Sequence, residues 1–499
     1  MNKKDLKPAS VFRYFDEINH IPRPSKHEEK MVEFLKGFGQ SRGLETIVDK
    51  VGNVLIKKPA TQGMEDKPQV TLQSHIDMVC DKLAGHEIDF LNDPIESYII
   101  SDEEAAALAE NEAEKDGGWL KARGTTLGAD DGIGCAMELA ILDADDIPHG
   151  PLECLFTVDE ETGLTGANNL EAKMLSSKIL INLDSEDEGV FFVSCAGGKT
   201  TTATFEYTKR EAPDGYFFIK STIKGLTGGH SGDDINKKRA NAAKILARFL
   251  YMEQKKMPLL LAQFNSGKLH NAIPRDGSIV FAVPFKEKET VRVDWNVFCS
   301  GVEEEFCMTE KNIEWGMEST QEEPVIPQSA GIRIMQALQA VHHGVFSVVQ
   351  DTSLGEITET SSNCAVVQTD DERLTIVTSQ RSNVMSNLTN MVDTVTAVFE
   401  LAGANGIIHN DGYPAWKMNP DSHIRKVARD CYKRLFGREP KIISIHAGLE
   451  CGLFSFRNPS LDMLSIGPTL RGVHSPDERL HIPSVGKVWD LLKEILKSI

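Results

Sequence analysis

Residues 71–79, with the sequence TLQSHIDMV, constrain the fold of this chain most narrowly, because this strand-like run has a histidine and an aspartate two positions apart near its end. In an extended strand, side chains at positions i and i+2 point to the same face, so His75 and Asp77 are expected to lie side by side. His75 could then bind a metal ion while Asp77 holds its second ring nitrogen. A strand that ends in an ordinary buried histidine would show the same pattern, so the rest of the chain has to decide.

Apolar strand-like runs alternate with helix-like segments through the first part of the chain. Apolar residues at helical spacing predict two helices between residues 10 and 42, separated by Pro22 and Pro24. A further helix is predicted at Ile133–Leu142. Strands are predicted at Glu45–Val48, Val54–Lys57, Gln69–His75, Leu152–Val158 and Lys178–Leu183. This alternation predicts an α/β domain with a mixed, largely parallel sheet flanked by helices.

The pattern changes after Asp184 and returns near the C-terminus. The middle of the chain mixes strand-like and helical runs, whereas the last hundred residues alternate again, with a helix at 424–436, a strand at 441–445 and a helix at 485–498. We therefore expect a catalytic domain in two parts, residues 1–194 and 398–499. Residues 195–397 are expected to form an inserted α+β lid and dimerisation domain.

The charge of the chain argues against two classes of partner. Its 54 lysines and arginines are outnumbered by 74 aspartates and glutamates, which gives a net charge of −20 and disfavours nucleic acid or an anionic membrane surface as the main partner. Nine cysteines without a CxxC pair suggest reduced thiols. The N-terminus lacks an apolar targeting segment, and no apolar run approaches the length of a membrane span. We expect a protein of the cytoplasm.

Carboxylates follow two of the predicted strands at the point where each strand ends. Asp159, Glu160 and Glu161 come after the run 152–158, and Asp184 comes after the run 178–183. Polar sites in such sheets lie at the carboxyl ends of the strands, so these groups and His75 are expected at one edge of the sheet. Three consecutive carboxylates repel one another unless a cation or a proton is shared among them.

Two loops offer further ligands. Gly128–Gly134 places Asp130 and Asp131 in a glycine-framed turn before a helix, where an aspartate often serves only as a helix N-cap. Glycines on both sides also permit the close backbone approach that a buried metal requires. His474 lies in a loop near the C-terminus. Carboxylate and imidazole ligands without sulfur suit zinc, manganese or cobalt.

Seven segments of the chain together resemble a known family. They read SHIDMV, LGADDGIG, DEETG, INLD, GGHSG, HAGLECGLF and GVHSPDE, and they extend over nearly the whole sequence. The family is that of the di-zinc metallopeptidases that include aminoacylase and the dipeptidases. The resemblance implies two divalent metal ions, most readily zinc, with cobalt or manganese as alternatives. One ion would be held by His75, Asp130 and Asp184, and the other by Asp130, Glu161 and His474.

The resemblance also implies roles for other residues. Glu160 would be the general base, and Asp77 would be the partner of His75. Substrate contacts would come from His230, Asn271, Arg381 and Glu450, with His230 stabilising the reaction intermediate, often in a neighbouring subunit's site. Read without the family, these are a turn histidine, a turn asparagine and a surface arginine, while Glu450 remains a possible partner for a substrate ammonium group.

Three functions are compatible with these residues. The resemblance favours a homodimeric enzyme that hydrolyses unblocked dipeptides, including Xaa-His and β-alanyl-His. The alternative on the same fold is an N-acyl-amino-acid deacylase or a carboxypeptidase, in which the residue at position 184 tends to be glutamate, whereas this chain has Asp184. A metal-binding scaffold without catalysis would be expected to lack a ligand or Glu160, and none is missing.

Overall fold

The computed structural model describes residues 3–109, 115, 118–351 and 355–499. These residues form two compact units. Unit 1 comprises Met1–Val193, Met418–Ser444 and Leu453–Ile499, and unit 2 comprises Ser194–Lys417 and Ile445–Gly452. We expected the chain to return to the first domain at residue 398. In the structure, residues up to Lys417 group with unit 2, because β19 (Gly406–His409) pairs with β9 (Gly197–Glu206) in its sheet.

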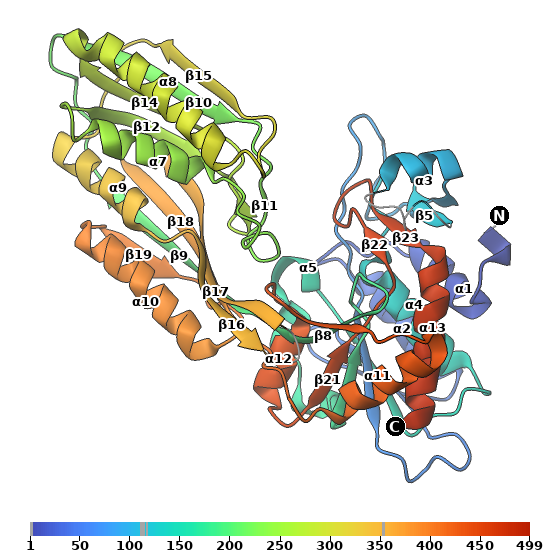
Figure 1. The fold of residues 1–499 in the computed structure, drawn as a ribbon. Helices are drawn as coiled ribbons and strands as arrows, with labels where there is room; N and C mark the ends of the chain where they lie inside the picture. The colour runs from blue at the N-terminus through green and yellow to red at the C-terminus, as the bar shows by residue number, and fades with distance from the viewer. Residues whose placement is uncertain (1–2, 110–114, 116–117, 352–354) are drawn as a thin grey trace. The chain divides into compact units, whose positions relative to one another are not determined.

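Unit 1 is built on an eight-stranded mixed sheet (Figure 1). Its order is β1 (Glu45–Val48), β2 (Val54–Lys58), β6 (Leu152–Thr157), β3 (Val70–His75), β7 (Ile179–Asn182), β21 (Asp462–Ser465), β8 (Val190–Cys195) and β20 (Lys441–Ile445). The four central strands β6, β3, β7 and β21 run parallel. β1, β2 and β8 pair antiparallel with their neighbours, so the parallel part occupies only the middle of the sheet.

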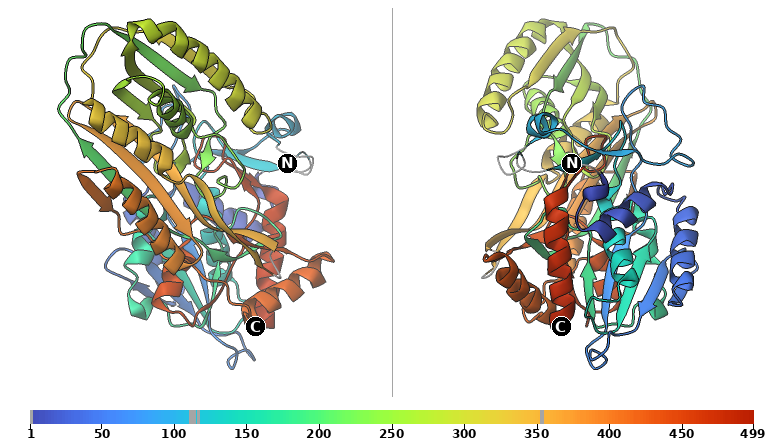
Figure 2. Two further views of the ribbon diagram at one scale, coloured as in Figure 1. Left: turned by 60° about the vertical axis from the view of Figure 1, so that its left-hand side comes forward. Right: turned by 90° about the vertical axis from the view of Figure 1, so that its right-hand side faces the viewer.

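Helices flank this sheet. α1 (Ala9–Asn19) packs on α4 (Ala129–Asp143), which packs on β3, while α2 (Glu29–Ser41) packs against β1 and β2. α11 (His423–Phe436) contacts β21 and α13 (Ile482–Ser498), the red helix in Figure 2. Every residue of β3 and β6 is buried, including polar ones such as Gln73 and Glu153, as expected for central strands that are covered on both faces.

Smaller elements complete unit 1. They are α3 (Asp102–Leu108), α5 (Glu160–Gly163), α6 (Thr165–Asn168), α12 (Glu450–Arg457), which begins in unit 2, and a four-stranded sheet of β22 (Leu470–Arg471), β23 (Arg479–His481), β5 (Trp119–Ala122) and β4 (Ser97–Ile99).

Unit 2 is an α+β unit around a nine-stranded sheet in which the strands pair antiparallel. Its order is β15 (Glu314–Ser319), β10 (Tyr216–Lys224), β14 (Gly277–Pro284), β12 (Leu260–Ser266), β17 (Gly355–Thr369), β18 (Arg373–Ser382), β9 and β19, with β16 (Gly344–Asp351) beside β17. A short ribbon pairs β11 (Gly229–His230) with β13 (Ala272–Ile273).

Four helices cover one face of this sheet in Figure 1. They are α7 (Ala242–Glu253), α8 (Lys288–Glu305), α9 (Gln328–Ala340) and α10 (Met385–Leu401). Between helices and sheet lies an apolar core that includes Phe249, Phe281 and Trp295. The predicted α+β class is therefore confirmed for this unit. None of the helices that the structure describes combines the length and the apolar character needed to cross a bilayer.

We predict that Phe249→Ala strongly destabilises the protein. Phe249 is fully buried, and its ring centroid lies 4.8 Å from that of Trp295 and 6.1 Å from that of Phe281. Truncation of a buried phenylalanine leaves a cavity and costs about 3–5 kcal/mol in the free energy of unfolding. Denaturant titration followed by circular dichroism measures this loss. Phe285→Ala is the control, because Phe285 is 63% exposed. Equal losses in both variants would contradict the placement of this core.

Candidate metal centre

The order of the central strands brings the predicted ligands to one edge of the sheet. β6, β3 and β7 are neighbours and parallel, so their carboxyl ends meet. His75 is the last residue of β3, Glu160 and Glu161 follow β6, and Asp184 follows β7. The peptide bond between Asp130 and Asp131 is cis.

Asp130 lies between two histidines. Its Oδ1 is 3.1 Å from His75 Nε2, and its Oδ2 is 3.2 Å from His474 Nε2. His75 Nε2 also lies 3.5 Å from Asp184 Oδ1, and His474 Nε2 lies 2.9 Å from Glu161 Oε2. The structure therefore brings together all five residues that we expected to act as ligands, with Asp130 in both groups.

The donor atoms fit divalent cations. In the group of His75, Asp130 and Asp184, and in that of Asp130, Glu161 and His474, the potential ligand atoms all lie within 4.8 Å of one another. Glu161 Oε1 is buried and has no hydrogen-bond partner in the described part of the chain. Oxygen and imidazole nitrogen are ligands that zinc, manganese and cobalt accept. Each group could thus hold one ion.

Burial and crowding shift the pKa values of these groups. Burial raises the pKa of Asp184 to about 7, although the nearby His75 opposes the shift. Burial lowers the pKa of His474, but hydrogen bonds with Asp130 and Glu161 outweigh this effect and raise it to about 11. The crowded carboxylates thus favour a proton on His474 and make Asp184 easier to protonate than an ordinary aspartate. A bound cation would compensate the same charge.

Asp77 contacts three parts of the centre. Its Oδ1 lies 3.4 Å from His75 Nδ1, as expected for a partner of that imidazole. Its carboxylate also accepts hydrogen bonds from the backbone N–H groups of Glu160, at 3.0 Å, and Glu161, at 3.2 Å. Ser25 Oγ donates to it at 2.8 Å. Asp77 therefore also fixes the first turn of α5, a contact that the sequence did not reveal.

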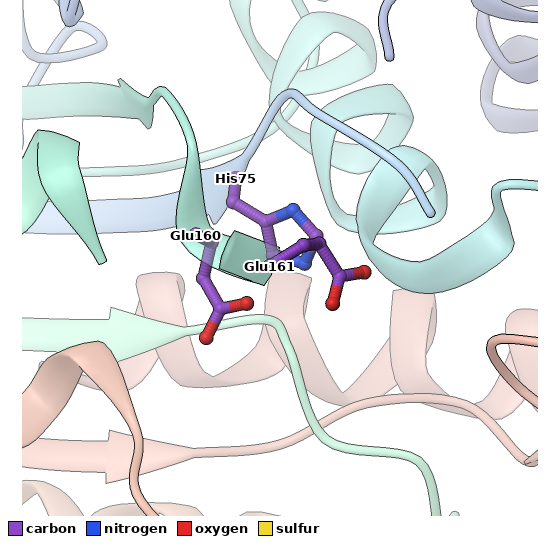
Figure 3. A group of neighbouring side chains, drawn as sticks. All are labelled: His75, Glu160 and Glu161. Carbon is purple, nitrogen blue, oxygen red and sulfur yellow. The ribbon is translucent and has the colours of Figure 1, made fainter. Parts of the chain in front are cut away.

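The three consecutive acidic residues have different surroundings. Figure 3 shows that the carboxylates of Glu160 and Glu161 point apart, on either side of His75 in that view. Glu161 faces His474, whereas Glu160 groups with His75 and Glu161. The carboxylate of Asp159 accepts hydrogen bonds from the hydroxyls of Thr162 and Thr165 and so serves the local backbone.

Two buried residues that the sequence did not single out hold the loops of the centre. Glu478 accepts hydrogen bonds from four consecutive backbone N–H groups, those of Leu127, Gly128, Ala129 and Asp130, at 2.7, 3.0, 2.7 and 3.3 Å. Arg23 donates to the carbonyl oxygens of Ile76, Asp77 and Gly128. Glu478 stands four residues after His474 in the quoted GVHSPDE segment, which was its only signal in the sequence.

All four expected substrate residues belong to unit 2. Arg381 is only 5% exposed, so it is not the surface arginine of the alternative interpretation. Its Nη2 lies 3.3 Å from His230 Nε2. The exposed Asn271 accepts a hydrogen bond at its carbonyl oxygen from the backbone N–H of Ser231, at 2.8 Å. Glu450 is fully buried, so solvent does not reach it in this structure. The roles of these residues stay predictions.

Buried carboxylates and imidazoles at the strand ends of an α/β sheet are typical of metal-dependent hydrolases. The comparison with protein families agrees with this class, because residues 72–498 match the model described as peptidase family M20/M25/M40. The chain belongs to this family and is a hydrolytic enzyme.

Two relatives are similar over almost the whole chain. The cytosol non-specific dipeptidase of Escherichia coli (strain K12) is 40% identical over 495 residues, which cover 99% of this chain and 98% of the relative. The crystal structure of aminoacylhistidine dipeptidase from Vibrio alginolyticus is 39% identical, with a TM-score of 0.85 and coverage of 100% and 98%. A tripeptidase structure from Staphylococcus aureus, 16% identical with a TM-score of 0.55 and coverage of 99% and 98%, shares the fold alone.

We predict that Glu478→Gln weakens metal binding. The amide would turn an N–H₂ group toward backbone donors and leave part of the turn at 127–130 without an acceptor. Residues that orient ligands typically change metal affinity about 10–100-fold when they are altered. Chelator competition measures the affinity directly. Glu439→Gln is the control, because Glu439 pairs with Lys433 at the surface. Unchanged affinity in Glu478→Gln would show that Asp130 keeps its position without this contact.

Proposed function

We propose that this chain hydrolyses unblocked dipeptides with two divalent metal ions. His75, Asp130 and Asp184 would hold one ion, and Asp130, Glu161 and His474 the other. The observation that carries the proposal is the position of Asp130, which offers one carboxylate oxygen to each histidine. The names of the two relatives with near-complete coverage support dipeptides as substrates, with aminoacyl-histidines among them. The family resemblance adds β-alanyl-His.

In the proposed mechanism the metal ions activate the substrate and water, and side chains of the protein transfer the proton. When bound, two such ions polarise the scissile carbonyl and lower the pKa of a water molecule. Glu160 takes a proton from the attacking water and delivers it to the leaving amine. The hydrogen bonds from the N–H groups of Glu160 and Glu161 to Asp77 support this role, because they fix the turn from which both side chains leave.

Unit 2 supplies candidates for substrate recognition. The Arg381 guanidinium is buried, and no carboxylate in the described part of the chain lies within ion-pair distance of it. We assign it to the C-terminal carboxylate of the substrate, which it can bind through two parallel hydrogen bonds. His230 is assigned to stabilising the negative charge of the tetrahedral intermediate. Its Nδ1 lies 3.2 Å from Asp233 Oδ2, which orients the ring.

Zinc is the metal we propose, with cobalt and manganese as alternatives that the same ligands accept. A cytoplasmic location is supported by the name of the Escherichia coli relative and by nine cysteines without a disulfide. The homodimer implied by the family resemblance is a further proposal, and light scattering of the purified protein tests it.

We predict that Glu160→Gln retains its metal but loses at least a hundredfold in kcat. A general base contributes typically ~10²–10⁴-fold to the rate, and glutamine cannot accept the proton of the attacking water. Metal analysis and steady-state kinetics on the same preparation separate the two effects. Normal turnover by a metal-loaded variant would remove Glu160 from the mechanism. Loss of metal would instead identify Glu160 as a ligand.

We predict that metal-dependent hydrolysis is at least a hundredfold faster for free dipeptides than for N-acetylated dipeptides. Acetylation removes a positive charge that a site rich in carboxylates attracts, and a hundredfold corresponds to ~2.7 kcal/mol, within reach of one lost charged contact. Values of kcat/KM for matched pairs of substrates give the ratio. A chelator should abolish both activities, and added zinc, cobalt or manganese should restore them. Comparable rates would favour the deacylase.

A further inference from the structure

We propose that Tyr413 is a positioning residue that orients Arg381 and thereby sets the preference for substrates with a free C-terminal carboxylate. This inference rests on the proposed role of Arg381 as the carboxylate receptor. Tyr413 lies 32 positions after Arg381. It follows β19 in the part of unit 2 that ends at Lys417. It belongs to none of the motifs that pointed to the family.

The guanidinium of Arg381 is held from two directions. Ser231 Oγ accepts hydrogen bonds from Nε and Nη2, both at 3.3 Å. The Tyr413 hydroxyl accepts one from Nη1 at 2.5 Å. An arginine carries five N–H donors in one plane, so a hydroxyl on each side fixes both the position and the tilt of that plane. Both acceptors are neutral and form no ion pair with Arg381, whose charge acts on the Asp233 carboxylate only through space, so an anion can still pair directly with the guanidinium.

The ring of Tyr413 is itself confined. A Cβ atom added at Gly198 would lie 2.4 Å from the Tyr413 hydroxyl oxygen, and one added at Gly448 would lie 2.5 Å from its ring. The backbone of Tyr413 also exchanges two hydrogen bonds with Gly198, each at 3.0 Å. The two glycines thus leave room for a ring that no larger residue would permit at these positions. Gly448 belongs to the HAGLECGLF segment, and its contact with the Tyr413 ring explains why this position has no side chain.

A fixed guanidinium and a mobile one recognise a carboxylate differently. Arginine loses much rotamer freedom when it is ordered, and a receptor that is ordered before binding does not incur this loss when the substrate arrives. Two parallel hydrogen bonds to a carboxylate also require the correct plane. Without the Tyr413 hydroxyl, Arg381 keeps its charge and loses one of its two lateral supports. The effect should therefore fall on substrate binding and only where a carboxylate is present.

The test compares Tyr413→Phe with the unaltered enzyme on a dipeptide and on the same dipeptide as its C-terminal amide. We expect KM for the free dipeptide to rise about tenfold, the size of one hydrogen bond to a charged group, with kcat within about threefold. KM for the amide should stay unchanged, because the amide lacks the charge that Arg381 reads. Equal changes for both substrates, or no change for either, would overturn the proposal.

Three further variants make the result specific. Gly448→Ala crowds the Tyr413 ring but keeps its hydroxyl, and it should shift the ratio of the two KM values in the same direction. Tyr207→Phe is the matched control, since it removes a hydroxyl that donates to Asp370 O elsewhere in unit 2 and should leave the ratio unchanged. Arg381→Met distinguishes failure of the Arg381 role from failure of the Tyr413 role. If Arg381→Met leaves the ratio of the two KM values unchanged, Arg381 does not bind the carboxylate. If Arg381→Met abolishes the preference for the free dipeptide while Tyr413→Phe does not alter it, only the role of Tyr413 fails.

Discussion

The concentration of buried negative charge around Asp130 is the constraint on which the rest of unit 1 depends. Asp130, Glu161 and Asp184 meet two imidazoles within hydrogen-bonding distance, and like charges at this spacing are costly unless protons or cations compensate them. Such a group persists only if the backbone cannot relax away from it. The hydrogen bonds from four N–H groups to Glu478 and from Arg23 to three carbonyl groups provide that restraint.

The restraint is also visible in the backbone torsions. Asp159 and His474 adopt positive φ angles of 49° and 61°, which non-glycine residues rarely do. Both positions lie in segments that are expected to supply ligands, and unfavourable torsions are kept where surrounding contacts determine the conformation. For Asp159 these contacts are the hydroxyls of Thr162 and Thr165 and the bond from its own N–H to Glu28. Asp159, the first acidic residue of the DEE run, therefore fixes the turn from which Glu160 and Glu161 project.

Local patterns in the sequence were enough to place His75 and Asp184, because a buried strand ends where its apolar run ends. They also gave the mixed sheet and most helices of unit 1. They did not give α8, whose surface is largely polar, or the extent of β17, whose 15 residues follow no simple alternation. The roles of Glu478 and Tyr413 could not be predicted for another reason. The hydrogen-bond partner Leu127 lies 351 positions from Glu478, and Arg381 lies 32 positions from Tyr413, so no local spacing indicates either contact.

Each unit buries charged side chains, negative ones in unit 1 and a positive one in unit 2. In unit 1, carboxylates crowd around two imidazoles. In unit 2, the guanidinium of Arg381 contacts the hydroxyls of Ser231 and Tyr413 and the imidazole of His230, and it forms no ion pair with a carboxylate among the described residues. A buried charge without a counter-ion reduces stability, so a fold retains one where a ligand supplies the missing charge. In unit 1 the fitting ligands are divalent cations. In unit 2 the proposed carboxylate role of Arg381 would have the same physical basis, because the terminal carboxylate of a short peptide is a small anion that could supply the missing charge.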